Sequence, residues 1–386
     1  MIKFLISAVI LGYMGCAKPL AINSDNHSKI QSATIIKKPN RTKLKREIGQ
    51  MLMLGFYGTS APKNSRICKD IRAYNIGAVI LFDVNPSNRK KPKNIIDKKQ
   101  LKQLTKELQR CSRGHDLLIA VDQEGGRVQR LKKKHKFYGN FPKASSIHTL
   151  KDSKVAKIYD KMATELREVG VNFNLAPVVD LSINPRNVVI NKLGRAFGKN
   201  PKTVSKYASI FMKQMHRHHI YTSLKHFPGH GSSLKDTHKG FVNVTKYWKE
   251  LELAPYKRLI AKGNIDTIMS AHIYNAKLDS QFPASLSYDI ITELLRDKMG
   301  YKGVVITDDL QMGAIAKKYN LEDTLLLSIQ AGNDILLFGN QLNPKHTVSA
   351  KTIIDRVIKL IDEDMLDEKS IEKAYIRIQK LKNKYL

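Results

Sequence analysis

"GVVITDDL", residues 303–310, joins a short apolar run to two consecutive carboxylates. Val304 to Thr307 are all β-branched, which is typical of a buried strand. A carboxylate directly after such a strand is costly to bury unless it is paired or held in a cleft for a reaction. Asp308 is therefore either salt-bridged or reactive. Asp309 could equally be the inward-facing carboxylate, or it could cap a helix that begins just after it.

The same pattern of a short β-rich run recurs along the chain. Segments with helical periodicity follow or separate these runs, and strand-helix alternation predicts a parallel sheet covered by helices. Eight such units are the number that closes a barrel, so the predicted fold class is α/β, a (β/α)8 TIM-type barrel. The eight predicted strands are Met51–Phe56, Gly77–Phe82, Asp116–Val121, Val171–Ala176, Tyr221–Leu224, Asp266–Ser270, Gly303–Thr307 and Asp334–Phe338. The predicted helices include Lys98–Cys111, Lys154–Val169, Thr203–His218, Lys249–Lys262, Tyr288–Met299, Leu321–Gln330 and Thr347–Ile361.

Polar residues gather where the predicted strands end. Asp122 follows Val121, Lys225 and His226 follow Leu224, and Ala271-His272 follows Ser270. A (β/α)8 barrel has its active site at this carboxyl-terminal face. A doubly wound sheet also binds ligands at strand ends, but it does not need eight strands, and no G-x-G-x-x-G opens a helix here.

The domain organisation follows from the two ends of the sequence. Residues 1–17 have the length of a secretory signal or a lipoprotein signal, with Cys16 as the candidate lipid anchor. Simple cleavage near Ala17 or an uncleaved anchor are the alternatives. Residues 18–40 are expected to be a linker, and residues 41–386 a single catalytic domain that includes C-terminal helices, the last within 365–386. The expected location is outside the cytoplasm, either free in the periplasm or medium or as a membrane-anchored lipoprotein.

The chain carries a formal net charge of +33 from 67 basic and 34 acidic residues. This charge favours polyanionic partners, but it also fits lysines spread over solvated faces, and no basic run interleaved with aromatics indicates a nucleic-acid module. No nucleic-acid partner is expected. Beyond Cys16 only Cys68 and Cys111 remain, and the sequence leaves open whether they pair.

"KHFPGHGSSLKDTH", residues 225–238, allows two kinds of chemistry. His226 and His230 have the i,i+4 spacing of a zinc site on a helix, but Pro228-Gly229 between them breaks the helix that this geometry requires. Asp236 and His238 suit acid/base chemistry, because a carboxylate bonded to one imidazole nitrogen leaves the other free to exchange a proton. A solvated loop histidine beside a loop aspartate is the simpler alternative.

"DQEGGRVQRL", residues 122–131, places two arginines after a strand-end aspartate. Gly125 and Gly126, between the aspartate and the first arginine, permit close backbone approach to a ligand. Arg127 and Arg130 could orient hydroxyls or an anion, or they could be surface arginines on a tight turn.

These motifs in this order resemble the glycoside hydrolase family 3 β-N-acetylglucosaminidases, which are single-barrel bacterial enzymes that act on cell-wall fragments. The resemblance covers roughly residues 45 to 340 and rests on "GAVILF", "DQEGGRVQRL", "NLAPVVDL", "GRAFG", "KHFPGHG" with "DTH", and "GVVITDDLQMGAI". It implies that Asp308 is the nucleophile and His238 the general acid/base, with Asp236 its partner. It implies sugar binding by Asp122, Arg130, Arg195, Lys225 and His226. Asp180 and His272 lie in matching segments and receive no specific role.

The resemblance implies a retaining exo-β-N-acetylglucosaminidase that acts on peptidoglycan-derived saccharides. It implies no metal and no cofactor. The apparent export signal and the strong basic charge depart from family members that work in the cytoplasm. Phosphorolysis on the same fold is a rival, since a histidine base would not repel phosphate, and a non-catalytic binding barrel and a metal-dependent hydrolase are rivals of other classes.

Overall fold

The computed structural model describes residues 40–114, 116–342 and 346–385. The predicted signal segment with Cys16, and the predicted linker up to residue 39, lie outside the described residues. From Asn40 onwards the chain forms one compact unit.

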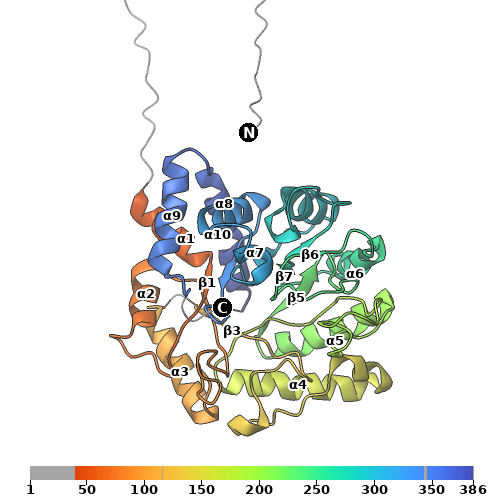
Figure 1. The fold of residues 1–386 in the computed structure, drawn as a ribbon. Coiled ribbons are helices and arrows are strands. Elements are labelled where there is room, and N and C mark those ends of the chain that lie inside the picture. Colours follow the sequence, from red (N-terminus) through yellow and green to blue (C-terminus); the bar gives the residue numbers. More distant parts are fainter. Residues whose placement is uncertain (1–39, 115, 343–345, 386) are drawn as a thin grey trace, which may run out of the picture. The chain divides into compact units, whose positions relative to one another are not determined.

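Eight parallel strands form the centre of this unit, with helices arranged around them (Figure 1). All eight predicted strands are present, although most are shorter than predicted. Along the sheet they follow the order β10-β1-β2-β3-β4-β5-β7-β9. Their bounds are β1 Leu52–Gly55, β2 Ala78–Ile80, β3 Leu118–Val121, β4 Phe173–Asn174, β5 Tyr221–Phe227, β7 Thr267–Ser270, β9 Val304–Thr307 and β10 Leu336–Phe338.

Strands β10 and β9, the first and last in that order, contact each other and so close the sheet. The backbone N–H of Thr307, at the end of β9, donates to the carbonyl oxygen of Ile335 at 2.9 Å, and Ile306 and Ile335 form a parallel bridge. Strand β10 in turn pairs with β1, with Leu336 opposite Leu52. The sheet is therefore a barrel, and the predicted (β/α)8 fold class is confirmed.

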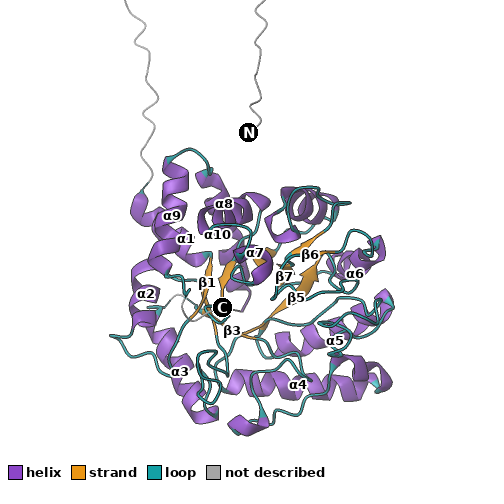
Figure 2. Cartoon of the chain, viewed as in Figure 1, coloured by secondary structure: helices purple, strands orange, loops and turns teal. Residues whose placement is uncertain are grey.

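Along the chain a helix follows every barrel strand, and the helices surround the strands (Figure 2). In order, these are α2 Arg66–Tyr74, α3 Lys98–Cys111, α4 Asp152–Glu168, α5 Pro201–Arg217, α6 Ala254–Lys262, the π-helix η5 Asp289–Lys298, α8 Leu321–Ala331 and α9 Ala350–Asp362. Outside this alternation lie α1 Arg41–Gln50, α7 Gly313–Ala316, α10 Glu368–Lys382, a two-stranded sheet of β6 Val242–Asn243 and β8 Ile273–Tyr274, and the 3₁₀ segments η1 Lys133–His135, η2 Ala144–Thr149, η3 Glu250–Leu253, η4 Ala284–Leu286 and η6 Asn383–Tyr385.

Two predicted helices differ in kind from the expectation. The segment predicted as one helix over Lys249–Lys262 is the 3₁₀ turn η3 followed by α6, and Pro255 lies in the first turn of α6, where a missing N–H does no harm. The segment predicted over Tyr288–Met299 is the π-helix η5. Helices α1 and α2 were not among the predicted ones, because both are short and rich in charged residues.

The barrel strands are buried on both faces, since side chains fill the interior and helices cover the outside. This is why the strands appear in the sequence as continuous apolar runs rather than as alternating patterns. Within the described residues, no helix combines the length and apolarity needed to cross a bilayer.

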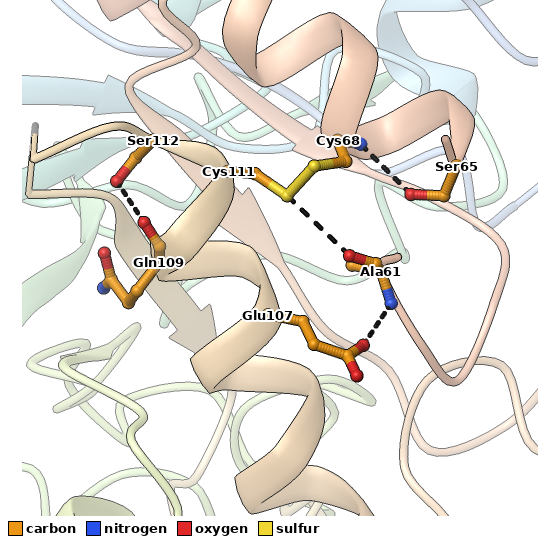
Figure 3. Close-up of a disulfide and its surroundings, with 7 residues drawn as sticks. All are labelled: Ala61, Ser65, Cys68, Glu107, Gln109, Cys111 and Ser112. Atoms are coloured by element: carbon orange, nitrogen blue, oxygen red, sulfur yellow. Dashed lines mark hydrogen bonds between the residues drawn. A yellow bond between two sulfur atoms is a disulfide. The ribbon is translucent and has the colours of Figure 1, made fainter. Parts of the chain in front are cut away.

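Cys68 of α2 and Cys111 at the end of α3 form a disulfide with a Cα–Cα distance of 5.2 Å (Figure 3). The pairing that the sequence left open is thus present. Beside it, the carboxylate of Glu107 accepts a hydrogen bond from the backbone N–H of Ala61 at 2.6 Å. The disulfide ties two neighbouring helices on the outside of the barrel.

Candidate active site

A cavity of about 650 Å³ opens at the carboxyl-terminal ends of the strands. Barrel strands place their following residues at this face, so side chains far apart in sequence converge there. All eight residues to which the resemblance assigns catalysis or sugar binding line this one cavity, namely Asp122, Arg130, Arg195, Lys225, His226, Asp236, His238 and Asp308. Arg127, the other arginine of its motif, is not among the lining residues.

The two carboxylates after β9 differ in their surroundings. One oxygen of Asp308 accepts the backbone N–H of Asp309 at 2.8 Å, and the other has no hydrogen-bond partner in the described part of the chain. Burial alone would raise the pKa of Asp308, but interactions with His272, His226 and His238 outweigh it and hold the pKa below its usual value. Asp308 is therefore an anion with a free oxygen at the cavity.

Asp309 is engaged in backbone contacts instead. Its Oδ1 accepts the N–H groups of Gln311 and Gly339, both at 3.1 Å. Burial raises its pKa to about 6. Asp309 thus closes the turn after β9 and ties it to the end of β10. It does not cap α7, whose N-cap position is Met312.

His272 is fixed on both ring nitrogens. Nδ1 lies 2.6 Å from the hydroxyl of Ser285, and Nε2 lies 2.9 Å from the carbonyl oxygen of Asp309. Since a carbonyl only accepts, Nε2 carries the proton and Nδ1 accepts from Ser285. His272 therefore holds the backbone of the two aspartates in place and does not itself line the cavity.

A network of buried ion pairs forms one wall of the cavity. The Nζ atom of Lys225 lies 3.0 Å from Asp122 and 2.8 Å from Glu124. Arg130 binds the second oxygen of Asp122 at 2.9 Å, and Arg195 binds Glu124 through two hydrogen bonds of 2.8 and 2.7 Å. Each carboxylate thus has two cationic partners.

These cations keep both carboxylates ionised. Burial opposes the charged forms, but Lys225 and Arg130 hold the pKa of Asp122 far below its usual value. Arg195 and Lys225 likewise lower the pKa of Glu124 to about 2. Glu124 was missed in the sequence analysis, although it lies only two residues after Asp122 in the motif that was singled out.

Asp180 orients His226. It is almost fully buried, and its two oxygens accept the backbone N–H groups of His226 and His230, at 3.2 and 2.8 Å, and the Nδ1–H of His226, at 2.7 Å. This leaves Nε2 of His226 directed to Arg195, 3.5 Å from its guanidinium. Asp180, to which the sequence assigned no role, therefore positions a residue that lines the cavity.

The loop with Asp236 and His238 completes the cavity. One oxygen of Asp236 accepts the backbone N–H of His238 at 2.9 Å and lies 2.8 Å from its Nδ1. The carboxylate therefore fixes Nδ1 as the protonated nitrogen and leaves Nε2 free to exchange a proton. The His238 side chain is 52% exposed, whereas that of Lys225 is 3% exposed.

Backbone contacts attach this loop to α7, just after the two aspartates. The N–H groups of Gly313 and Ala314 donate to the carbonyl oxygens of His238 and Thr237, at 3.3 and 3.1 Å. A side chain at position 313 would place its Cβ 2.9 Å from the oxygen of His238, so the glycine permits this approach. Backbone contacts thus hold the loop next to α7, and the Nζ of Lys317 adds a hydrogen bond to the carbonyl oxygen of Lys239 at 2.9 Å.

The histidines of this region are not arranged as a metal site. Strand β5 continues to Phe227 and a turn follows, so His226 and His230 do not share a helical face. Nδ1 of His226 is taken by Asp180, as described above. Across the ranges that the structure describes, no group of three or more His, Cys, Asp or Glu side chains is placed to hold a metal ion.

An eight-stranded barrel with a free carboxylate and an Asp–His pair at its carboxyl-terminal face defines a barrel glycoside hydrolase. The Glycosyl hydrolase family 3 N terminal domain matches residues 43–381. The chain belongs to this family, as its motifs predicted.

Curated relatives carry hexosaminidase names. A beta-hexosaminidase A of Pseudoalteromonas piscicida is 31% identical over 372 residues, which cover 87% of this chain and 60% of that protein. A beta-hexosaminidase of Tolumonas auensis is 33% identical over 295 residues, which cover 75% of this chain and 82% of that protein. The chain thus spans somewhat over half of the first relative and most of the second.

Solved structures of the family share the fold. A family 3 β-N-acetylglucosaminidase from a Paenibacillus species matches with a TM-score of 0.75 and 29% identity, over 88% of this chain and 62% of that one. A β-N-acetylhexosaminidase from Beutenbergia cavernae matches with a TM-score of 0.75 and 27% identity, over 88% of this chain and 98% of that one. The second match covers nearly the whole of that chain.

Proposed function

We propose that this chain is a retaining exo-β-N-acetylglucosaminidase that hydrolyses terminal β-linked N-acetylglucosamine from peptidoglycan-derived saccharides. The observation that carries the proposal is the convergence of an unpaired Asp308 carboxylate and the Asp236–His238 pair on one cavity. The hexosaminidase names of the relatives support the sugar. The polar side chains of Asp122, Arg130, Arg195, Lys225 and His226 at the cavity support its binding, because a site that offers charged hydrogen bonds to hydroxyls binds ligands without those hydroxyls much more weakly.

The proposed reaction has two displacements. Asp308 attacks the anomeric carbon, the bond to the leaving oxygen breaks, and Nε2 of His238 gives that oxygen a proton. Water then attacks the glycosyl-enzyme while His238 takes a proton from it, and the bond to Asp308 breaks. The lowered pKa of Asp308 supports its role, since the nucleophile must be ionised.

Histidine replaces the second carboxylate that most retaining glycosidases use. A neutral imidazole repels the anionic nucleophile less than a carboxylate would, and Asp236 stabilises the imidazolium that remains after water is deprotonated. The same absence of repulsion would admit phosphate as the acceptor in the second step. If the enzyme forms a sugar 1-phosphate in phosphate buffer, its reaction is phosphorolysis rather than hydrolysis.

The deciding experiment compares two neighbouring carboxylates. Asp308→Ala is expected to abolish release of p-nitrophenol from its β-N-acetylglucosaminide, a loss of about 10⁴-fold or more. Asp309→Ala is the matched variant, and it should retain more activity because the hydrogen bonds of the Asp309 carboxylate go to backbone groups. Full activity in Asp308→Ala would refute the proposal, and loss in Asp309→Ala alone would move the nucleophile by one residue. Proton NMR of the first product formed tests retention.

We also propose that the enzyme works outside the cytoplasm, exported by the segment 1–17, with Cys16 as the site of a lipid anchor. The Cys68–Cys111 disulfide supports this, because disulfides persist in oxidising compartments and are rare in the cytosol. Incorporation of radiolabelled lipid that disappears in Cys16→Ser is the expected result for an anchor. If the wild-type protein takes up no label, there is no lipid anchor, and the proposal reduces to export with simple cleavage of the signal.

A further inference from the structure

The positive charge of the chain is unevenly distributed around the barrel. Residues 98–217, which run from α3 to α5, contain 26 basic and 9 acidic residues, whereas the equally long range 267–386 contains 16 of each. Helices α3, α4 and α5 follow one another around the outside of the barrel (Figure 1). The excess of basic residues is therefore concentrated in one sector of the molecule.

Contacts between these three helices make them one continuous surface. The hydroxyl of Thr105 in α3 donates a hydrogen bond to the carbonyl oxygen of Val169, which directly follows α4, at 2.7 Å. The rings of Tyr159 in α4 and Phe211 in α5 pack together at a centroid distance of 4.8 Å. These residues are buried, and the charged residues of the helices lie on the opposite, solvent side. We call this solvent side the α3–α5 face.

Exposed cations recur along each helix of the face. Their spacings of three, four or eleven residues place them on one side of a helix. They are Lys99, Lys102, Lys106 and Arg110 in α3, Lys154, Lys157 and Lys161 in α4, and Lys202 and Lys213 in α5. None of them forms an ion pair with a residue that the structure describes, although Lys161 lies over the ring of Tyr138. The face thus presents many positive charges that the described chain does not neutralise.

One hollow of the face lies on α3. Its volume is about 510 Å³, and its two charged lining residues are Lys106 and Arg110. Gln109, which also lines it, is engaged with the backbone, since its amide donates to the carbonyl oxygen of Leu117 at 2.8 Å. Gly170 borders the hollow just before β4, and no residue lines both this hollow and the catalytic cavity. The hollow is therefore a separate cationic depression on the outside of the barrel.

The shape and composition of the face favour a flexible chain over a bilayer. Within α3, α4 and α5 no large apolar side chain is exposed, whereas helices that insert into a membrane surface present such side chains. Neighbouring helices around a barrel also face in different directions, so a plane touches only part of the face, while a chain can follow it from helix to helix. The same lack of exposed rings leaves no platform on which nucleic-acid bases stack.

The kind of cation favours phosphate over carboxylate. The three helices contain ten lysines and three arginines. An ammonium group attracts phosphate as a point charge, whereas the planar fork of arginine gives the geometric match that a carboxylate uses best. A surface made mainly of lysines thus fits a series of phosphates.

We propose that the α3–α5 face is a docking surface for a flexible linear polymer that carries a phosphate on each repeating unit. Successive phosphates lie against the lysines of neighbouring helices, and one of them enters the hollow between Lys106 and Arg110. The bound polymer retains the protein while the cavity at the carboxyl-terminal end of the barrel stays open. This docking does not depend on the proposed glycosidase function.

The test measures binding of fluorescein-labelled dextran phosphate to the full chain by fluorescence anisotropy at a series of salt concentrations. Lys102→Gln/Lys106→Gln/Arg110→Gln on α3 should weaken binding about tenfold at low salt, because exposed ion pairs are individually weak. The slope of log Kd against log salt concentration should fall by about 2, since each lost phosphate contact removes about 0.7. Lys154→Gln/Lys157→Gln on α4 should weaken binding about fivefold.

Lys369→Gln/Lys373→Gln/Lys380→Gln is the matched control. These three exposed lysines lie on α10, and their removal gives the same net charge as the α3 variant. Binding should stay within about twofold of wild type, because these lysines lie outside the docking surface. Equal weakening in both triple variants would mean that net charge alone attracts the polymer, and this would overturn the docking surface. Unchanged binding in the α4 variant would overturn its extension beyond α3.

Two further probes test the chemistry of the partner. Carboxymethyl dextran of equal charge should bind about fivefold more weakly than dextran phosphate. Vesicles of phosphatidylcholine and phosphatidylglycerol should bind less tightly per phosphate than dextran phosphate does. Equal binding of the carboxylate polymer, or tighter binding of the vesicles, would overturn a phosphate-bearing chain as the partner.

Activity and docking can fail separately. None of the substituted residues lines the catalytic cavity, so kcat/KM for p-nitrophenyl β-N-acetylglucosaminide should equal that of wild type in every variant, which also shows that the variants fold. If the wild type does not cleave this substrate, the proposed function is wrong, and urea unfolding replaces activity as the test of folding. If it cleaves the substrate but does not bind dextran phosphate, only the docking surface is wrong.

Discussion

The two ends of the barrel both hold buried charges, but they use them differently. At the amino-terminal end, Asp334 accepts hydrogen bonds from Arg296 and Arg377, both at 2.7 Å, and from the N–H of Val305 at 2.8 Å. Both oxygens of Asp334 thus join helices to strands. At the carboxyl-terminal end, the charged groups that line the cavity leave atoms facing it.

Two buried lysines, one at each end of the barrel, illustrate this difference. Lys382 of α10 donates to Gln50 and to the carbonyl oxygen of Gly77, both at 2.9 Å, and burial lowers its pKa to about 7. Its partners are neutral, so it can be uncharged. Lys225 lies between two carboxylates, which outweigh burial and raise its pKa above the usual value. The amino-terminal lysine is a structural hydrogen-bond donor, and the carboxyl-terminal one is a permanent cation at a cavity.

Among the variants that compare the two ends of the barrel, Lys225→Met should have the largest effect. The substitution leaves Asp122 and Glu124 each with one cation fewer, which should destabilise the fold by about 3–5 kcal/mol and lower kcat/KM by about 10²–10³-fold. Lys382→Met is the matched control, and it should lose some stability in urea unfolding while its kcat/KM stays near wild type. A large loss of activity in Lys382→Met would break the distinction between the two ends.

His238→Ala should separate the two parts of the carboxyl-terminal end itself. The side chain is half exposed and is attached through Asp236, so its removal costs little stability. The rate should fall by about 10²–10³-fold in kcat, because proton transfer to the leaving oxygen is lost. Substrates with an acidic leaving group should lose less than those with a sugar leaving group. Equal losses for both kinds would contradict a role in protonation.

The contrast between the ends also explains how much could be predicted from sequence. Strand-end residues of the carboxyl-terminal face stand out because a charge follows an apolar run, as in Asp308 after Thr307. This pattern predicted the barrel, and the motifs predicted the residues that meet in the cavity. The shorter helices α1 and α2 were not predicted, because their apolar residues are few.

Residues that act through partners could not be predicted in this way. Glu124 was not singled out beside Asp122, since only the fold shows that it shares Lys225 with that residue. Lys93 lies in the basic stretch of residues 83–94, yet it is buried and donates to the carbonyl oxygens of Gly339 and Asn340. The choice between Asp308 and Asp309 likewise required their hydrogen bonds. Glu124 and Lys93 have partners more than 100 positions away in the sequence, and local patterns do not contain such contacts.

Asp266→Asn tests the structural role of the amino-terminal end. Burial would raise the pKa of Asp266, but His216 and Lys384 outweigh it, so the pKa lies below its usual value. The carboxylate therefore stabilises the fold fully above its unfolded pKa of about 4, and this contribution is lost as the pH falls through the lower folded value. Asp266→Asn should lose about 3–5 kcal/mol at pH 7, and its difference from wild type should shrink toward pH 3. Urea unfolding at both pH values measures this, with exposed Asp297→Asn as the control, and an equal difference at both would refute it.

The disulfide should have the smallest effect on activity, because it lies in neither charged region. It closes a loop of 43 residues between two outer helices, so its main effect is on the unfolded chain. Cys68→Ser/Cys111→Ser should lower the free energy of unfolding by about 2–4 kcal/mol and leave kcat/KM unchanged within about twofold at temperatures where the variant is folded. Wild-type protein treated with reductant should match the variant. Loss of activity in a variant that remains folded would mean that the α2–α3 wall also positions the cavity, through the loop that follows β2.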